Sequence, residues 1–238
     1  MFFYIDWMYI ILVLPAVIFS IVASARVNST FKKYSSVHNR AGLTGAEVAR
    51  RILYENGLYD VKIEQAHGHL TDHYDPRTNT VRLSESTYNS TSSSAIGVCA
   101  HEVGHAIQHA RGYIPLKIRN AIVPATNLGA KLSIPLILIG ILLSTLGEAF
   151  AWIAYAGVAC FSLCLIFQLL TLPTEFNASR RALKSIAEGG YLTREETVGA
   201  KRVLRAAAMT YVGALAVTLA QFLRLLLIVA RIGGNRRR

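Results

Sequence analysis

The segment His101-Glu102-Val-Gly-His105 carries the residues of this chain whose types and spacing indicate chemistry. Histidines four residues apart lie on one face of a helix, where both imidazoles can bind the same Zn²⁺. The glutamate beside the first histidine is then placed to accept a proton from a water that the metal activates. We therefore predict that His101 and His105 are zinc ligands and that Glu102 is the general base.

His109 follows one turn after His105, so the helix could present a third imidazole. Along a straight helix with a rise of roughly 1.5 Å per residue, however, His109 lies about 12 Å from His101. One ion cannot comfortably hold all three histidines. We interpret His109 as a surface residue or as a residue that supports the ligands, and the third ligand must come from elsewhere.

The composition indicates that these residues belong to a membrane protein. Hydrophobic residues make up 53% of the 238 positions, and the mean hydropathy is +0.37, which is high for a soluble protein. Four apolar runs are candidate spans, since about 20 apolar residues cross a bilayer. The fourth contains Arg224, so a tilted or interfacial helix is the alternative to the fourth crossing that we favour. The runs cover residues 7–25, 132–146, 150–172 and 211–230.

The first apolar run has two interpretations. Ala23-Ser24-Ala25 resembles a cleavage site, so the run could be a signal peptide that is removed. Secretory signals begin with positive charge, however, whereas the residues before this run contain Asp6 and no Lys or Arg. We therefore favour an uncleaved membrane anchor.

The net charge of +11 is distributed in clusters that indicate topology. Basic residues follow the first run, precede the second and follow the third, which predicts that these segments are cytoplasmic. The turn at Gly147-Glu148 has no Lys or Arg near it and is predicted outside. A fourth crossing would place Arg236–Arg238 outside as well, against the charge rule. No basic stripe with interleaved aromatic residues indicates nucleic-acid binding.

A carboxylate is the usual partner of two histidines in a catalytic zinc site. Among the acidic residues after His109, Glu148 is predicted on the opposite side of the membrane. Glu188, Glu195 and Glu196 lie at a Gly-Gly break or at a helix start. Glu175 begins a predicted helix where the third apolar run returns to the cytoplasmic side, so we choose Glu175 as the third zinc ligand.

Between the first and second apolar runs, the sequence predicts a small α+β region. A capping box at Thr44 and Glu47 begins a helix that ends at Asn56-Gly57, and a second capping box at Thr193 begins the last long helix. The other predicted elements are strands at residues 61–63, 70–74 and 80–84, and helices at residues 94–112 and 175–187.

Three segments together resemble the YugP-type neutral zinc metallopeptidase family of bacterial membranes: HEVGHAIQHARGY, LPTEFNASRRAL and LTDHYDPRTNTVRLS. The resemblance runs over most of the chain and extends to the broader glutamate-zincin arrangement of membrane proteases. It implies that His101, His105 and Glu175 bind zinc and that Glu102 is the base. Relatives often have an aspartate where this chain has Ser179, so the resemblance does not carry over that support of a histidine ligand, and Asn177 is the candidate to replace it.

We expect an α-helical membrane protein with a small α+β zincin-like peptidase domain and about four transmembrane helices. The domains would be a transmembrane anchor at residues 7–25 and a zincin-like catalytic domain at 26–131. The remaining segments would be a transmembrane hairpin at 132–172, helices carrying the third zinc ligand at 173–210 and a transmembrane or interfacial helix at 211–230.

Other residues are candidates for supporting roles. In zincin-type sites an exposed edge strand holds an extended substrate, and residues 80–84 are our choice for that strand, with plain scaffolding as the alternative. His67, His69 and His73 could form a second metal cluster, although their spacing is a weak indication. The candidates for oxyanion stabilisation are Tyr211, His73 and Arg180.

These patterns predict a membrane-anchored zinc endopeptidase with protein or peptide substrates, embedded in a bacterial cell membrane with its catalytic domain in the cytoplasm. The alternative is a non-catalytic membrane protein that binds metal as a structural clip, or binds partners through its sheet. Glu102 favours the enzyme, because a structural site has no need of a base. A role in the turnover of membrane proteins follows only from the location and the resemblance.

Overall fold

The computed structural model describes residues 6–234, and these residues form two compact units. The helical unit comprises the described parts of Met1–Val22, Ile118–Leu172 and Tyr211–Arg238. The mixed unit, which contains the strands, comprises Ala23–Lys117 and Pro173–Thr210. Each unit is therefore assembled from segments that are distant in the sequence.

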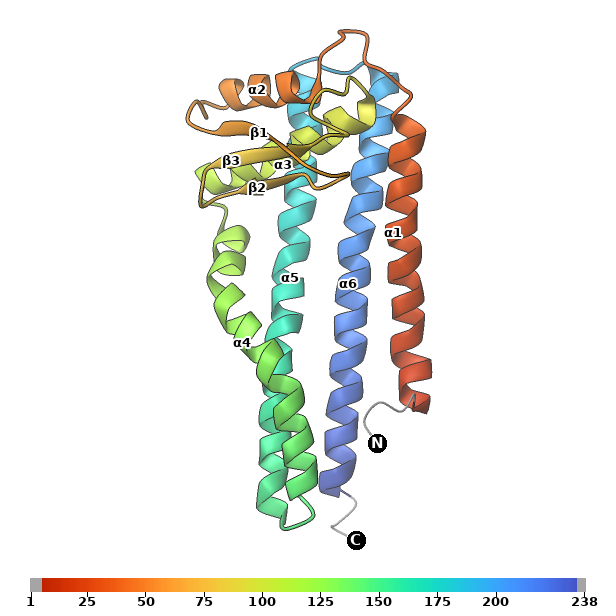
Figure 1. The fold of residues 1–238 in the computed structure, drawn as a ribbon, viewed down its shortest axis with the longest axis vertical. Helices are drawn as coiled ribbons and strands as arrows, with labels where there is room; N and C mark the ends of the chain where they lie inside the picture. The colour runs from red at the N-terminus through yellow and green to blue at the C-terminus, as the bar shows by residue number, and fades with distance from the viewer. Residues whose placement is uncertain (1–5, 235–238) are drawn as a thin grey trace. The chain divides into compact units, whose positions relative to one another are not determined.

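Four long helices are apolar enough to cross a membrane, as the composition predicted (Figure 1). The first begins as a π-helix, Tyr9–Val13, and passes through Ala23-Ser24-Ala25 without a break. The fourth is continuous through Arg224. Arg236–Arg238, whose predicted position on the outer side of the membrane conflicts with the charge rule, lie beyond the described residues. The helices are α1, Leu14–Tyr34; α4, Ile114–Leu143; α5, Ala151–Glu188; and α6, Arg194–Gly234.

The prediction of a separate helix over residues 175–187 was wrong, because α5 runs from the third apolar run to Glu188 without interruption. Pro173 lies inside α5 and lacks an N–H to donate to the preceding turn. Long membrane helices tolerate a proline of this kind, because neighbouring groups compensate for the lost hydrogen bond. The helix ends where the sequence predicted, at Gly189-Gly190, and Gly190 has a left-handed φ of +62°.

In the helical unit, α4 and α5 form a hairpin joined near the 3₁₀ turn Glu148–Phe150 (Figure 1). Gly157 allows the two helices to approach closely, because a Cβ there would lie 2.7 Å from the carbonyl oxygen of Ser133. Small residues at such contacts are typical of paired membrane helices. The hairpin contributes to a buried cluster with α6: Ile137, Ala154, Val158, Leu225 and Val229.

Arg224, the charged residue inside the fourth apolar run, is paired with Asp6. Its Nη2 lies 2.8 Å from Oδ2 of Asp6, and its guanidinium carbon lies 5.4 Å from the ring centroid of Tyr9. A second cation–π contact joins Arg231 to the ring of Trp7 at 5.1 Å. The chain segment at the start of the first helix is thus held to α6 within this unit.

The three strands of the mixed unit form one sheet in the order β1-β3-β2. β3 pairs with β1 in parallel and with β2 antiparallel, so both of its edges are occupied. The prediction that residues 80–84 are an exposed edge strand was therefore wrong. Polar and apolar residues alternate along Thr80-Val-Arg-Leu-Ser84 in a way that fits a central strand as well as an edge strand. The pattern therefore could not distinguish the two positions. The strands are β1, Lys62–Ala66; β2, His73–Asp75; and β3, Thr80–Ser84.

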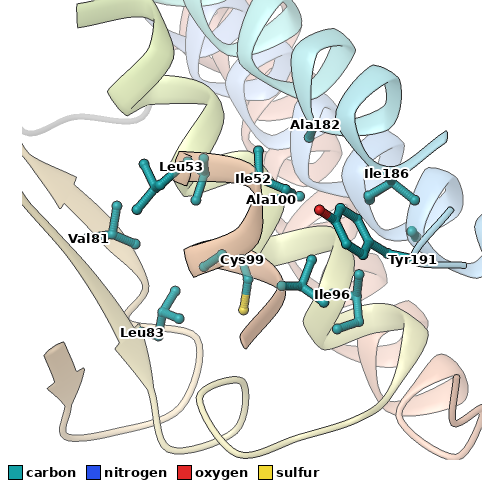
Figure 2. Packing of buried hydrophobic residues seen from close by; sticks show 14 of the residues in the cluster. Ile52, Leu53, Val81, Leu83, Ile96, Cys99, Ala100, Ala182, Ile186 and Tyr191 are labelled. Atoms are coloured by element: carbon teal, nitrogen blue, oxygen red, sulfur yellow. The ribbon is translucent and has the colours of Figure 1, made fainter. Parts of the chain in front are cut away.

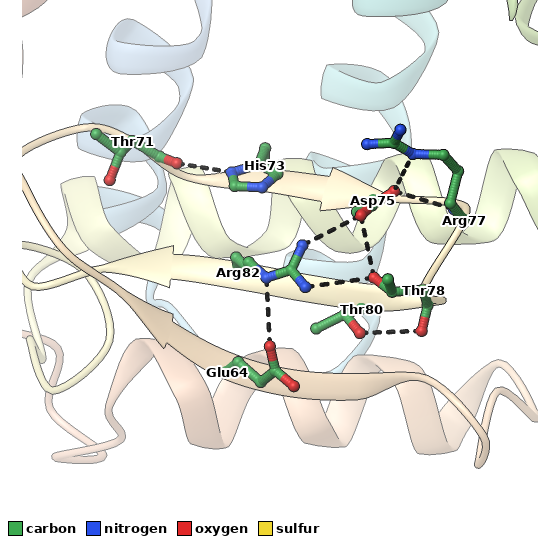
Figure 3. Close-up of polar contacts among 8 residues, drawn as sticks. All are labelled: Glu64, Thr71, His73, Asp75, Arg77, Thr78, Thr80 and Arg82. Atoms are coloured by element: carbon green, nitrogen blue, oxygen red, sulfur yellow. Dashed lines mark hydrogen bonds and ion pairs between the residues drawn. The ribbon is translucent and has the colours of Figure 1, made fainter.

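Arg82, in the middle of β3, links all three strands through its guanidinium group (Figure 3). Its Nε donates to Oε2 of Glu64 on β1 at 3.2 Å, and its Nη1 donates to Oδ2 of Asp75 on β2 at 3.2 Å. Such cross-strand pairs favour one register. The segment before β2 is less extended than predicted, because Leu70 has a left-handed φ of +55° and the strand begins only at His73.

The core of the mixed unit lies among the sheet, α2 (Gly45–Glu55), α3 (Ser93–Ala110) and the end of α5 (Figure 2). The predicted capping box begins α2, since Thr44 Oγ1 accepts from the N–H of Glu47 and Glu47 Oε2 accepts from the N–H of Thr44. Apolar side chains from each element converge and hold α3 in place. They include Ile52, Leu53, Val81, Leu83, Ile96, Cys99, Ala100, Ala182, Ile186 and Tyr191.

Candidate metal centre

α3 carries the histidines, and most of its residues are buried. Ser92 caps its start, because Ser92 Oγ accepts a hydrogen bond from the N–H of Ala95 at 3.2 Å. It ends before Gly112, whose left-handed φ of +63° turns the chain away. The helix predicted for residues 94–112 is therefore confirmed, and the packing around it fixes the backbone from which the imidazoles project.

His101, His105 and Glu175 lie together, and their potential ligand atoms are all within 4.8 Å of one another. Oε2 of Glu175 lies 3.2 Å from Nε2 of His101 and 3.4 Å from Nε2 of His105. In tetrahedral zinc sites with bonds near 2.0–2.1 Å, two ligand atoms are separated by about 3.3 Å. The residues present therefore fit a zinc ion in both donor chemistry and spacing.

Gly104 brings α5 close enough for Glu175 to reach the histidines. A Cβ at this position would lie 2.7 Å from the carbonyl oxygen of Ala178, so any side chain there would push the helices apart. Glu175 and Ala178 are three residues apart on α5 and so lie on neighbouring positions of one helix face. The glycine within the HExxH segment thus has a packing role in the mixed unit.

The second nitrogen of each imidazole is held by a side chain. Nδ1 of His101 lies 3.1 Å from Oγ of Ser179, the residue that stands where relatives often have aspartate. Nδ1 of His105 lies 3.0 Å from Oε1 of Gln108. Asn177 contacts Gln108 and does not itself reach a histidine. Both Nε2 atoms are thereby directed towards Glu175, as a metal site requires.

Gln108 is the residue of this site that sequence reasoning missed. Its side chain is fully buried, although it lies between Ile107 and His109 in the sequence. Its spacing of three residues from His105, which places both on one helix face, was the available signal, because a buried polar group needs hydrogen-bond partners. Those partners come from α5, and their identity could not be predicted from α3 alone.

Glu102 is buried beside the two histidines, with a relative exposure of 9%. Its carboxylate forms no hydrogen bond or ion pair with any residue between 6 and 234 whose side chain the structure describes. Burial raises the pKa of Glu102, and the neighbouring His101 and His105 offset part of that rise. An unpaired carboxylate with a raised pKa is suited to accepting and returning a proton.

The electrostatics of His105 combine opposing effects. Burial lowers the pKa of His105, but its hydrogen bonds and its proximity to Glu175 and Glu102 together outweigh burial and raise the pKa. The two acidic side chains thus favour positive charge at the point where the ligand atoms meet. A divalent cation would satisfy the same preference.

His109 lies apart from this group. Its Nδ1 is 2.8 Å from the hydroxyl of Tyr74, and the same hydroxyl donates to Oδ1 of Asn79. His109 therefore contacts Tyr74 on β2 and does not belong to the group of potential metal ligands. This agrees with our interpretation of His109 as a supporting or surface residue.

The three upstream histidines do not gather. His67 contacts Glu85, His69 packs against Phe31, and His73 Nδ1 lies 2.9 Å from the carbonyl oxygen of Thr71 (Figure 3). Within the described part of the chain, the only group of three or more potential metal ligands is the one containing Glu175.

The candidates for oxyanion stabilisation lie in different surroundings. His73 is exposed on β2, and Arg180 is exposed on α5 next to Ser179. Tyr211 belongs to the helical unit. None of them belongs to the group of potential ligands among the residues that the structure describes.

Asp72 has a structural task that the sequence did not reveal. Its carboxylate accepts hydrogen bonds from the N–H and the hydroxyl of Ser84, both at 2.8 Å, and from the hydroxyl of Thr87. These bonds tie the end of β3 and the following turn to the segment before β2. Asp72 therefore anchors the loop that leads into α3.

Comparisons with known proteins gave matches over most of the chain. Residues 9–230 match the model of a family described as "Putative neutral zinc metallopeptidase". Over 221 residues, the chain is 46% identical to "Putative membrane protease YugP" of Bacillus subtilis (strain 168), which covers 93% of this chain and 96% of that protein. No solved structure matches the chain.

Proposed function

The chain belongs to the family of neutral zinc metallopeptidases, and from this premise we propose that it is a membrane-anchored zinc endopeptidase. Zinc is the cofactor of the family, and the chain is an α-helical membrane protein with a small sheet-containing unit. The observation that carries the proposal is the grouping of His101, His105 and Glu175 beside the buried, unpaired carboxylate of Glu102.

In the proposed reaction, His101, His105 and Glu175 hold the zinc ion. Zinc, when bound, polarises the scissile carbonyl and lowers the pKa of water towards about 7. Glu102 accepts a proton from the attacking water as the water oxygen bonds to the carbonyl carbon. Glu102 then returns that proton to the amide nitrogen as the carbon–nitrogen bond breaks, which yields a carboxylic acid and an amine.

The sheet supports an extended peptide as substrate, with β2 in place of β3 as the strand that binds it. β2 is at the end of the sheet, and it packs against α3, the helix that carries the histidines. An edge strand offers main-chain N–H and C=O groups to a peptide, so binding requires no particular side-chain sequence. We place the substrate chain along β2, beside His73 and Tyr74.

The same proposal covers the domains and the location. Residues 26–131 and 173–210 form the catalytic part, and residues 7–25, 132–172 and 211–230 form the membrane part. The division into two compact units at similar positions supports this arrangement. We place the catalytic part in the cytoplasm of a bacterial cell, where it would act on membrane or membrane-proximal proteins.

The experiment that tests the function compares the wild type with Glu102→Gln, both purified in detergent as full chains. Glu102→Gln keeps the zinc ligands and removes the base, so bound zinc should be retained while peptide hydrolysis falls by about 10²–10⁴-fold. Glu188→Gln changes an exposed glutamate on α5 and should leave both measurements unchanged. Hydrolysis by Glu102→Gln at the wild-type rate would contradict the role of Glu102.

The topology is tested by labelling single cysteines at positions 112 and 185 in a chain that lacks Cys99, Cys160 and Cys164. Both positions should react with an impermeant reagent from the cytoplasmic side only, because the α4–α5 hairpin crosses the membrane twice between them. Labelling from opposite sides would contradict the arrangement.

A further inference from the structure

We propose that Gln108, Asn177 and Arg181 form a hydrogen-bond chain that fixes the tautomer of His105 and thereby sets the affinity of the site for zinc. The proposal rests on the ligand role of His105 in the proposed function. It assigns a positioning task to three side chains that do not themselves touch the metal position.

Gln108 is at the centre of this chain. It is fully buried and uses its whole amide group. Its Nε2 lies 2.8 Å from the carbonyl oxygen of Thr174 and 3.0 Å from Oδ1 of Asn177, and its Oε1 lies 3.0 Å from Nδ1 of His105. The two contacts to Nε2 come from α5, and the contact to Oε1 stays within α3. The amide therefore connects the helix that bears Glu175 to the helix that bears the histidines.

The orientation of each amide follows from partners that have only one possible role. A guanidinium group can only donate hydrogen bonds, so Arg181 Nε, 2.8 Å away, must meet the oxygen of Asn177. A backbone carbonyl can only accept, so Gln108 must present its NH₂ group to Thr174. Asn177 Oδ1 then accepts from both Arg181 and Gln108, and each N–H of the Gln108 amide has a partner.

The consequence for His105 is that its Nδ1 must donate. Gln108 Oε1 is the only part of the amide left to face the ring, and it can only accept a hydrogen bond. The proton of neutral His105 therefore lies on Nδ1, and the lone pair lies on Nε2, which points towards Glu175 at 3.4 Å. This is the tautomer that can bind a metal through Nε2.

His101 differs in this respect. Its Nδ1 faces the hydroxyl of Ser179, which can either donate or accept. That contact orients the ring but does not select a tautomer. The three-residue chain thus gives His105 a fixed protonation pattern that His101 does not receive from its own partner.

Breaking the chain should weaken zinc binding without removing any ligand. Losses of about 10–100-fold in metal affinity are typical when the group that orients a histidine ligand is removed. In Asn177→Leu, the Gln108 amide loses one of its two acceptors, and only the Thr174 carbonyl still holds its orientation. In Arg181→Met, the Asn177 amide loses the donor that fixes its orientation. Asn177→Asp keeps an oxygen acceptor for both neighbours.

The experiment measures the zinc dissociation constant of the detergent-purified full chain by competition with a chelator. Asn177→Leu should bind zinc about 10–100-fold more weakly, Arg181→Met should bind more weakly by a smaller factor, and Asn177→Asp should stay close to the wild type. Lys184→Met, an exposed change one turn from Arg181, is the matched control and should not alter the constant. Unchanged zinc affinity in both Asn177→Leu and Arg181→Met would overturn the proposal.

A second readout separates this proposal from the proposed function. Nitrogen-15 NMR of histidine-labelled, metal-free protein should show His105 protonated on Nδ1 in the wild type and a smaller share of Nδ1-protonated His105 in Asn177→Leu. His105→Ala identifies the signal and should itself abolish zinc binding. Zinc binding that survives His105→Ala would contradict the ligand assignment, whereas a wild-type His105 signal with an unprotonated Nδ1 would contradict the hydrogen-bond chain alone. Should Asn177→Leu fail to fold, Arg181→Met carries both measurements.

Discussion

The two units of this protein treat buried charge in opposite ways. In the helical unit, Arg224 is paired with Asp6, and its side chain is only 11% exposed. In the mixed unit, Glu102 is buried with no hydrogen bond or ion pair to the described side chains, although Glu175 and two histidines lie beside it. The first arrangement pairs a charge in an apolar region with an opposite charge, and the second leaves a carboxylate without a hydrogen bond or ion pair among the described side chains.

The difference separates a structural use of charge from a chemical one. Burying an ion costs several kcal/mol unless a partner repays it, so the Asp6–Arg224 pair makes an otherwise costly arginine acceptable in an apolar helix. A buried carboxylate without a partner is costly to the fold, and such groups cluster at functional sites. Variants in the two units should therefore differ in kind: changes in the helical unit should affect stability, and changes around Glu102 should affect zinc and activity.

The largest effect is expected for Glu175→Ala. Removing one of three ligands should reduce bound zinc from about one per chain to near zero and abolish hydrolysis, because two histidines alone do not complete the site. Zinc per chain is measured by elemental analysis after dialysis. Glu188→Ala removes an exposed glutamate from the same helix and is the control. Full zinc in Glu175→Ala would mean that the third ligand is another residue.

Gly104→Ala should affect both fold and metal. The added methyl group would clash with the Ala178 carbonyl, and overpacking of this kind lowers the free energy of unfolding by about 1–3 kcal/mol. A lower melting temperature and weaker zinc binding should appear together, because α5 must move away from α3. Gly147→Ala, whose Cβ would make an ordinary contact at 3.7 Å, is the control. A melting temperature as high as that of the wild type would show that the helices can separate without cost.

Arg224→Met should change stability without changing zinc. Asp6 would lose its partner, and because its side chain is 30% exposed, the cost should lie between surface and buried pairs, about 1–2 kcal/mol. Thermal unfolding in detergent measures the loss, and zinc titration should match the wild type. Adding Asp6→Asn should recover part of the stability, because no unpaired carboxylate remains. Loss of zinc in Arg224→Met would break the distinction between the two units.

The smallest effect concerns a compensated charge within the mixed unit. Hydrogen bonds from the N–H of Arg77 and from Arg82 lower the pKa of Asp75 to about 2, below the 3.8 of an ordinary aspartate. Asp75 therefore stabilises the fold above about pH 3.8, and this contribution is lost as the pH falls through about 2. Asp75→Asn should have a slightly lower melting temperature than the wild type at pH 6, and this difference in melting temperature should decrease between pH 5 and pH 3. A difference that is independent of pH would exclude the carboxylate as its cause.

Local spacing was enough to predict the helical part of the site. The interval between His101 and His105 places both imidazoles on one helix face, and the return of the third apolar run favoured Glu175 over the other acidic residues. The structure brings these three residues together. The capping boxes at Thr44 and Thr193 were equally local and were confirmed.

Features that depend on partners distant in sequence could not be predicted in the same way. The central position of β3 is decided by its pairing with both β1 and β2, which alternation does not encode. The role of Gln108 depends on Thr174 and Asn177, more than 60 residues further along the chain. The continuity of α5 through Pro173 depends on surroundings that the local signal for a helix break does not contain.

The pairing of Asp6 with Arg224 also has a consequence for the order in which the protein is made. The two residues are 218 positions apart. At a synthesis rate of roughly 5–20 residues per second, Arg224 is added about 10–40 s after Asp6. Throughout that interval the first helix lacks its ionic partner. The salt bridge therefore forms only after nearly the whole chain has been translated, and it distinguishes a finished molecule from a growing one.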